Sequence, residues 1–337
     1  MSMINASDVL VTVRFFDEEA VARLQDRGHR VIRADIPYDA IDSVVTPAVE
    51  AALDTVRAWI IGAAPISREL LSRHPNLHVV ARRGVGFDTV DVPAIQSLGR
   101  LLTNTPGGNE PAVADHAVGL MLAVGKRVVE AHARMKDGQW GVLVGTELYR
   151  KTVGLVGLGR IGRHVAQRLS GFEARVLAFD PYLDEETAKR AGVTRCSLEE
   201  VLTQSDYVSL HAPLTDQTRH IISAGALKLM KPQAILVNTS RGELVDEGAL
   251  LAALRSNRIA GAGLDVFACE HEPGLRSLAD QLVALPTVVG TPHSAASSQE
   301  SLRRANLTAA ECVAAALEGL PVPPHCIVAD GRPALIN

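Results

Sequence analysis

The stretch that decides the fold runs from residue 152 to residue 162 and reads Thr152-Val-Gly-Leu-Val156-Gly157-Leu-Gly159-Arg-Ile-Gly162. Its apolar start, residues 152–156, predicts a strand, and a helical pattern over residues 163–170 follows the glycines. A second predicted strand, residues 175–179, leads directly into Asp180. A lone Gly-x-Gly-x-x-Gly is weak evidence, but strand, glycine turn, helix, second strand and acid in this order predict a dinucleotide-binding βαβ unit.

Each residue of this motif has a physical role in the predicted site. Gly157 allows a tight turn, Gly159 lets a pyrophosphate approach the backbone, and Gly162 permits close packing of helix on strand. The helix N-terminus offers N–H groups and the positive end of its dipole to phosphates. Asp180 can accept hydrogen bonds from both ribose hydroxyls and would repel a 2′-phosphate, which favours NAD over NADP. The alternative, a glycine turn followed by a solvated surface acid, requires all these features to coincide by chance.

Short apolar runs alternate with amphipathic stretches on both sides of the motif, which predicts an α/β fold with parallel sheets. Long helical patterns cover residues 18–27, 111–135 and 298–317. Further apolar runs predict strands at residues 9–13, 31–34, 58–61, 77–81, 100–102, 207–210, 234–237, 263–266 and 287–290.

The chain of 337 residues is long enough for about two domains. Chain crossings between them are predicted at the Pro/Gly-rich stretch 104–108 and near Thr291-Pro292. The first domain would then be discontinuous, with residues 1–104 and 294–337, and the second would comprise residues 105–293. We expect the last helix to return to the first domain.

Composition excludes several classes of partner. The formal net charge is −4 and aromatic residues make up 4%, so neither a basic nucleic-acid surface nor a base-stacking platform is predicted. No apolar run reaches the roughly 18 residues of a membrane-spanning helix, and the first residues do not resemble a secretory signal. The cysteines form no Cys-x-x-Cys pair, which favours reduced thiols, a cytoplasmic location and no metal site. They are Cys196, Cys269, Cys312 and Cys326.

Three side chains near the ends of predicted strands form a candidate catalytic set: Arg241, Glu270 and His293. The carboxyl ends of strands face the ligand crevice in a doubly wound sheet. Arginine suits an anionic substrate, and histidine suits proton transfer near neutral pH, where a neighbouring carboxylate would favour its imidazolium form. Each side chain alone could instead be a surface or buried pairing residue, and Glu272 is a close rival of Glu270.

At these residues the chain resembles the D-2-hydroxyacid dehydrogenase family, in its phosphoglycerate dehydrogenase-like group. The resemblance covers nearly the whole chain and implies two Rossmann-like domains with a cleft between them, a flavodoxin-like substrate domain and an NAD-binding domain. The matching blocks begin at Arg83-Gly-Val-Gly-Phe-Asp88, Asn104-Thr-Pro-Gly-Gly-Asn109, Lys151-Thr-Val, Ser209-Leu-His211, Asn238-Thr-Ser-Arg241, Asp265-Val-Phe and Thr291-Pro-His293.

The resemblance implies a role for each matching residue. Arg241 would bind the substrate, His293 would be the proton donor and acceptor, and Glu270 its carboxylate partner. The backbone of Val85 and Gly86 would receive the substrate carboxylate. Cofactor contacts would come from Gly157, Gly159, Arg160, Ile161, Gly162, Asp180, His211, Ala212, Pro213, Thr218, Ser240, Asp265 and His293. The family also implies a homodimer through the NAD-binding domain, and Trp140 resembles a tryptophan that some members lend to the partner, with ordinary interface packing as the alternative.

The resulting hypothesis is an NAD-dependent oxidoreductase that interconverts a D-2-hydroxy acid and its 2-keto acid. The family usually has proline directly after the glutamate, whereas here His271 follows Glu270 and Pro273 follows Glu272, so both carboxylates remain candidate partners of His293. The block around His293 is closer to the C-terminal-binding corepressors, which makes an NAD(H)-sensing regulator the alternative. A formate or phosphite dehydrogenase is a third possibility, but formate enzymes typically pair the histidine with glutamine.

The substrate itself is not predicted. Specificity would come from first-domain residues near 37–39, 62–66 and 82–87. Arg82 and Arg83 could reach a second anionic group such as a phosphate, or could simply pair at the surface.

Overall fold

The computed structural model describes residues 7–34 and 45–333. The first residues, considered above for a secretory signal, and the predicted specificity segment 37–39 lie outside these ranges. The described chain divides into two compact units, 1–109 with 297–337 and 110–296, each of which is described by itself. No helix in the described ranges is both long and apolar enough to span a membrane.

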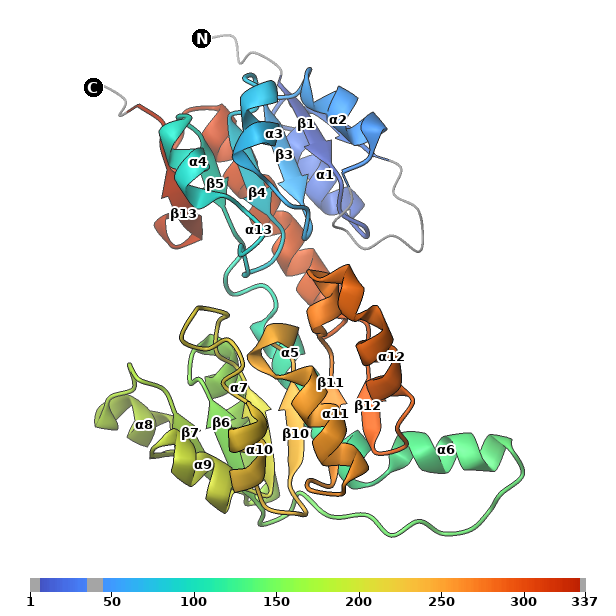
Figure 1. Ribbon diagram of the computed structural model, residues 1–337. Coiled ribbons are helices and arrows are strands. Elements are labelled where there is room, and N and C mark those ends of the chain that lie inside the picture. The colour runs from blue at the N-terminus through green and yellow to red at the C-terminus, as the bar shows by residue number, and fades with distance from the viewer. Residues whose placement is uncertain (1–6, 35–44, 334–337) are drawn as a thin grey trace. The chain divides into compact units, whose positions relative to one another are not determined.

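The first unit is built on a six-stranded sheet in the order β13-β5-β4-β3-β1-β2 (Figure 1). All neighbouring strands pair in parallel except β13, which is antiparallel to β5. The strands are β1 (Asp8–Val11), β2 (Arg30–Arg33), β3 (Ala58–Ile61), β4 (Val79–Arg82), β5 (Leu101–Thr103) and β13 (Ile327–Asp330). The helices are α1 (Glu18–Gln25), α2 (Pro47–Leu53), α3 (Arg68–Arg73), α4 (Val92–Ser97) and α13 (Gln299–Leu317), with a short 3₁₀ turn η5 (Pro324–Cys326).

Alternating side chains of these strands supply two separate cores. Val9 and Val11 lie in a core with α1 and α13, whereas Leu10 lies in a core with α2, α3 and α4. Successive residues of a strand point to opposite faces, so strands made almost entirely of apolar residues can bury both faces of the sheet. The unit is therefore a sheet covered by helices on both sides.

The second unit has a seven-stranded, fully parallel sheet in the order β12-β11-β10-β9-β6-β7-β8 (Figure 1). The chain runs outward from β6 to β8 and then returns through β9 to β12, so the strand order reverses between β6 and β9. The strands are β6 (Thr152–Val156), β7 (Arg175–Phe179), β8 (Thr194–Arg195), β9 (Tyr207–Leu210), β10 (Ile235–Asn238), β11 (Gly261–Leu264) and β12 (Val288–Gly290).

Helices cover both faces of this second sheet as well. One core joins α5, α7 and α8 to the strands, and the other joins α9, α10, α11 and α12. The helices are α5 (Glu110–Gly125), α6 (Val128–Lys136), α7 (Arg160–Leu169), α8 (Glu185–Ala191), α9 (Leu198–Gln204), α10 (Ala224–Leu229), α11 (Glu247–Arg255) and α12 (Arg276–Val283). Short 3₁₀ turns are η1 (Ser170–Phe172), η2 (Gly242–Leu244), η3 (Ala268–Glu270) and η4 (Pro273–Leu275). The prediction of two doubly wound α/β units is confirmed.

The prediction of one helix over residues 111–135 is wrong, because the structure has two helices there. The end of α5 packs closely on β9, because a Cβ at Gly125 would lie 2.4 Å from the Tyr207 hydroxyl. Arg127 then adopts a left-handed conformation (φ +54°) and redirects the chain into α6. The sequence pattern misses this break because both segments are helical and only three-dimensional packing separates them.

The predicted strand 263–266 is displaced, since β11 covers Gly261–Leu264. Glycines usually weaken a strand assignment, but here they allow neighbouring segments to approach the backbone of β11 closely. A Cβ at Gly261 would lie 2.6 Å from the Thr287 carbonyl oxygen, and one at Gly263 would lie 2.9 Å from the Leu120 Cβ. Strand β13 has no counterpart among the predicted strands.

Candidate active site

The glycine turn joins β6 to α7 at the point where the strand order reverses. Gly157 has φ +97°, and a Cβ there would lie 2.7 Å from the His211 backbone. A Cβ at Gly162 would lie 2.4 Å from the Gly157 carbonyl oxygen, so both positions need glycine. Gly159, by contrast, borders open space, because a Cβ there meets nothing within 4 Å. That space, next to the first N–H groups of α7, suits a bound phosphate group.

Asp180 follows β7 and holds the glycine turn. Its Oδ2 accepts from the Leu158 N–H and its Oδ1 accepts from the Tyr182 N–H, both at 2.9 Å. Each carboxylate oxygen keeps a further lone pair that can accept a ribose hydroxyl. Arg160 and Ile161 open α7, and the Arg160 guanidinium lies 3.8 Å from the Glu110 carboxylate. The residues predicted to hold a dinucleotide therefore leave space for it and carry charges that suit it.

The segment after β9 lies against this turn. His211 Nε2 is 2.9 Å from the Ser209 hydroxyl, and burial lowers the pKa of His211 to about 4, so its ring is neutral near pH 7. The Ala212 N–H group lies beside Gly157. The Thr218 hydroxyl donates to the Pro213 carbonyl oxygen at 2.6 Å and closes the loop. Because β9 and β7 lie on opposite sides of β6, this segment and Asp180 flank the glycine turn from opposite sides.

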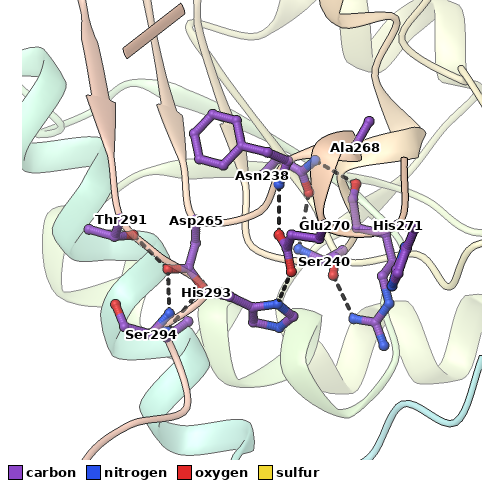
Figure 2. A network of polar contacts seen from close by, with 12 residues as sticks. Asn238, Ser240, Asp265, Ala268, Glu270, His271, Thr291, His293 and Ser294 are labelled. Carbon is purple, nitrogen blue, oxygen red and sulfur yellow. Dashed lines mark hydrogen bonds and ion pairs between the residues drawn. The ribbon is translucent and has the colours of Figure 1, made fainter. Parts of the chain in front are cut away.

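His293 and Glu270 meet at the carboxyl ends of β12 and β11. His293 Nδ1 lies 2.6 Å from Glu270 Oε2, and Glu270 Oε1 accepts from the Phe267 N–H at 2.8 Å (Figure 2). The His293 side chain is 42% exposed, so its ring remains accessible while its carboxylate partner is mostly covered. Bonding of Nδ1 to a carboxylate fixes the tautomer and leaves Nε2 for proton exchange.

The backbone around His293 is fixed by Asp265, which is fully buried. Its Oδ1 accepts from the Thr291 hydroxyl and the Ser294 N–H, and its Oδ2 accepts from the Ala295 N–H (Figure 2). Burial alone would raise the pKa of Asp265, but these bonds and His116 hold it below its ordinary value. His293 itself has φ +50°, an uncommon conformation that its N–H stabilises by donating to the Asp265 carbonyl oxygen at 2.7 Å.

Arg241 follows β10 and lies in the same unit. Its Nη1 donates to the Ser240 carbonyl oxygen at 2.7 Å, and its own carbonyl oxygen accepts from Asn238 Nδ2 at 2.7 Å. The Ser240 hydroxyl donates to the Leu210 carbonyl oxygen at 2.9 Å, which links the segment to β9. The guanidinium and its flanking turn are thus held at the carboxyl edge of the sheet, where an anion can be bound bidentately.

The structure distinguishes the two candidate carboxylates. Glu272 lies 3.8 Å from Arg219, and both side chains are largely exposed, whereas Glu270 contacts His293.

Sequence reasoning missed other residues of this region: His116 on α5, whose Nε2 is 2.9 Å from the Thr291 hydroxyl, and two buried glutamates, Glu243 and Glu247. Glu243 directly follows Arg241-Gly242, and this position was a signal in the sequence that it belongs to the site. Its contact with His271 could not be predicted, because the two residues are far apart in sequence.

Val85 and Gly86 lie in the first unit, in the loop after β4. Asn104 Nδ2 donates to the Val85 carbonyl oxygen at 2.9 Å, and Arg82 Nε donates to the Gly86 carbonyl oxygen at 3.0 Å. Arg82 Nη1 also donates to the Arg83 carbonyl oxygen at 2.8 Å. Arg82 thus braces its own loop, and both carbonyl groups of the predicted carboxylate-binding pair are already engaged.

Comparison with known proteins gives consistent matches. The family model described as D-isomer specific 2-hydroxyacid dehydrogenase, NAD binding domain, matches residues 118–295. A glyoxylate reductase of Korarchaeum cryptofilum is 43% identical over 269 residues, which cover 78% of this chain and 80% of the relative. A D-3-phosphoglycerate dehydrogenase of Mycobacterium tuberculosis is 42% identical over 274 residues, and the match spans 80% of this chain but only 50% of that longer relative.

Solved structures show the same similarity. The D-lactate dehydrogenase of Aquifex aeolicus, solved as a complex with NAD and lactic acid, superposes with a TM-score of 0.82 at 29% identity. The superposition covers 97% of this chain and 100% of that one. Similarity over nearly the whole length of both chains means that both units, and not only the dinucleotide motif, share this architecture.

The fold, the glycine turn and the histidine–carboxylate pair define a dinucleotide-dependent oxidoreductase. More specifically, the chain belongs to the D-isomer specific 2-hydroxyacid dehydrogenase family. Its cofactor is NAD, and the resemblance found from the sequence motifs is confirmed.

Proposed function

We propose that the protein interconverts a D-2-hydroxy acid and its 2-keto acid, with His293 as the general acid and base. The observation that carries this proposal is the 2.6 Å contact between His293 Nδ1 and Glu270 Oε2, in the unit that contains the complete glycine turn. Histidine titrates near neutral pH, so a ring that is oriented by a carboxylate yet accessible to solvent suits reversible proton transfer.

In the direction of reduction, His293 would donate the Nε2 proton to the carbonyl oxygen of the keto acid. Bound NADH supplies the hydride. Glu270 would hold the imidazolium in place through Nδ1, and its own second oxygen is fixed by the Phe267 N–H at 2.8 Å. In the direction of oxidation, the neutral ring would take the proton from the substrate hydroxyl. The pair would therefore stabilise the charge that develops on the ring.

Arg241 would bind the substrate carboxylate from the second unit. Its guanidinium is restrained by the Ser240 carbonyl oxygen, so the side chain would lose less conformational entropy when the substrate binds. We propose that the first unit is the substrate domain and that the N–H groups of Val85 and Gly86 bind the substrate. The bonds from Asn104 and Arg82 to the two carbonyl oxygens would fix the direction of those N–H groups.

The proposed cofactor residues would contact three parts of the dinucleotide. Gly157, Gly159, Arg160, Ile161 and Gly162 would hold the pyrophosphate, and Asp180 the adenosine ribose. The segment of His211, Ala212, Pro213 and Thr218 would border the adenosine side, whereas Ser240, Asp265 and His293 would lie near the nicotinamide. The neutral His211 ring and the open space beside Gly159 are compatible with this arrangement.

We further propose a cytoplasmic homodimer that forms through the NAD-binding unit. No residue of α6 is buried within its own chain, and the segment that follows exposes apolar side chains. Trp140 is 77% exposed, and Val142 and Val144 are more exposed still. Covering such side chains would favour association, either by ordinary interface packing or with Trp140 reaching the partner's site. None of the four cysteines, all of which lie in the described ranges, forms a disulfide, which is compatible with a reducing compartment.

A substrate panel tests the proposed activity. NADH oxidation should be measured with glyoxylate, hydroxypyruvate, pyruvate, branched 2-keto acids and phosphohydroxypyruvate, with His293→Ala as the control for contaminating dehydrogenases. We expect turnover of at least one of them by the wild-type protein and loss of that turnover in the variant. NADH binding without turnover of any 2-keto acid would contradict the proposal and would favour the dinucleotide-sensing regulator.

A further inference from the structure

We propose that His271 and Glu243 form a positioning pair that fixes the turn η3 and thereby sets the alignment of Glu270 on His293. This inference rests on the proposed function of His293 and Glu270. His271 directly follows Glu270, so any tether on His271 acts one residue away from the carboxylate that contacts His293.

The contact between the two side chains is short, and it joins a buried carboxylate to a histidine whose side chain is 35% exposed. His271 Nδ1 lies 2.6 Å from Glu243 Oε1, and the Glu243 residue is only 3% exposed. Burial alone would raise the pKa of Glu243, but the hydrogen bond from His271, with the charge of Arg219, keeps it below its ordinary value. Glu243 is therefore ionised near neutral pH, and the Nδ1–H of His271 donates to it.

The backbone of η3 packs directly on η2, the turn that carries Glu243. A Cβ at Gly242 would lie 2.1 Å from the Ala268 nitrogen and 2.1 Å from the Phe267 carbonyl carbon, so the two turns touch without an intervening side chain. Gly242 also follows Arg241. The pair thus links the segment that carries Arg241, the proposed substrate-binding residue, to the segment that carries Glu270.

Both ends of η3 are held by buried glutamates. Glu247 Oε1, from α11, accepts from the Ala268 N–H at 2.8 Å at the start of the turn, and Glu243 holds His271 directly after its end. Glu270 lies between these two anchors, and its own Oε1 binds back to the Phe267 N–H. If the second anchor is lost, the Glu270 carboxylate can move relative to His293 although neither residue has changed.

Kinetics of His271→Ala and His271→Asn test this inference, with the 2-keto acid found to be turned over. The Asn Nδ2 occupies nearly the position of the His Nδ1 and can donate to Glu243, whereas Ala cannot. We expect His271→Ala to lower kcat about tenfold, as misplacement of an acid–base group does, with the KM for the keto acid and the Kd for NADH unchanged. His271→Asn should recover kcat to within about threefold of the wild-type value, since the donor is restored.

A double variant separates positioning from stability. In His271→Ala the buried Glu243 charge loses its partner and the protein should unfold at a lower temperature. In His271→Ala/Glu243→Gln that charge is gone, so we expect the unfolding temperature to recover while kcat stays low. As a matched control, His74 in the first unit binds the Asp54 carboxylate through Nδ1 at 2.8 Å. His74→Ala should leave kcat within about twofold of the wild-type value, because the His74–Asp54 pair shares no partner with His271 or Glu270.

Two outcomes would overturn the positioning role: a kcat of His271→Ala equal to that of the wild type, or a kcat that recovers together with the unfolding temperature in the double variant. Failure of the proposed function is a separate result, because it would leave His293→Ala as active as the wild type. An inactive His293→Ala variant combined with a fully active His271→Ala variant would disprove only the positioning role.

Discussion

Two histidine–carboxylate pairs with almost the same geometry lie at opposite edges of their sheets. In the first unit, His74 Nδ1 is 2.8 Å from Asp54 Oδ1, and these residues end α3 and α2, directly before β4 and β3. In the second unit, His293 Nδ1 is 2.6 Å from Glu270 Oε2, and these residues follow β12 and β11. One pair therefore lies at the amino edge of a parallel sheet and the other at the carboxyl edge.

The burial of the two histidines is reversed as well. The His74 side chain is 4% exposed and its carboxylate is at the surface, whereas the His293 side chain is 42% exposed and its carboxylate is mostly covered. A buried ring with an exposed partner can join two helix ends but cannot reach a ligand. An exposed ring with a covered partner can do so. The comparison teaches that the contact alone is no reason to propose catalysis. The proposal for His293 rests on its place at the carboxyl edge of the sheet and on the exposure of its ring.

The largest expected effect comes from removing each histidine in turn. His293→Ala should lower kcat by about 10²–10⁴-fold, the usual contribution of general acid–base catalysis. His74→Ala should instead lower the free energy of unfolding by about 1–2 kcal/mol through the loss of a hydrogen bond and buried contacts. Steady-state kinetics and urea unfolding of both variants measure the two effects. A large drop in kcat for His74→Ala would break the comparison.

A smaller effect should separate the two neighbouring carboxylates of the second unit. Glu270→Gln keeps an oxygen near His293 but removes the charge that would stabilise the imidazolium, so we expect kcat to fall by about tenfold or more. Glu272→Gln changes only an exposed ion pair with Arg219 and should leave both kcat and stability nearly unchanged. Equal losses in the two variants would show that Glu272 also acts on His293.

The smallest effect concerns Glu247, a carboxylate that is buried without a histidine. Burial raises the pKa of Glu247, and the nearby charges of Glu243 and Glu270 raise it further, while the bond from the Ala268 N–H opposes them. A raised pKa in the folded protein means that the contribution to stability is complete below the unfolded value near 4.5 and is lost as the pH rises through the folded value.

Glu247→Gln keeps an oxygen for the Ala268 N–H and cannot ionise. The variant should match the wild type near pH 4 and should be more stable by about 1 kcal/mol at pH 8. Urea unfolding at a series of pH values measures this difference. A stability difference that does not change with pH would show that Glu247 does not titrate in this range.

The first βαβ segment of the second unit, residues 152–180, could be predicted, because the glycine turn and Asp180 satisfy local requirements that leave a pattern in sequence. The break between α5 and α6 could not, since it lies at the left-handed conformation of Arg127 (φ +54°), which arginine rarely adopts and which its sequence does not indicate. Strand β13 was missed because it pairs antiparallel with a strand more than 200 residues earlier, a contact that leaves no local pattern.

The amino-acid sequence by itself determined the α/β class, the dinucleotide motif and the residues Arg241, Glu270 and His293 as candidates, because strand periodicity and glycine spacing are local properties. Only the tertiary structure decided that Glu270 and not Glu272 contacts His293, and that His271 binds Glu243. These contacts depend on the directions in which the side chains of Glu270, His271 and Glu272 point. The directions are set by η2 and α11, which contact η3 but are distant from it in sequence.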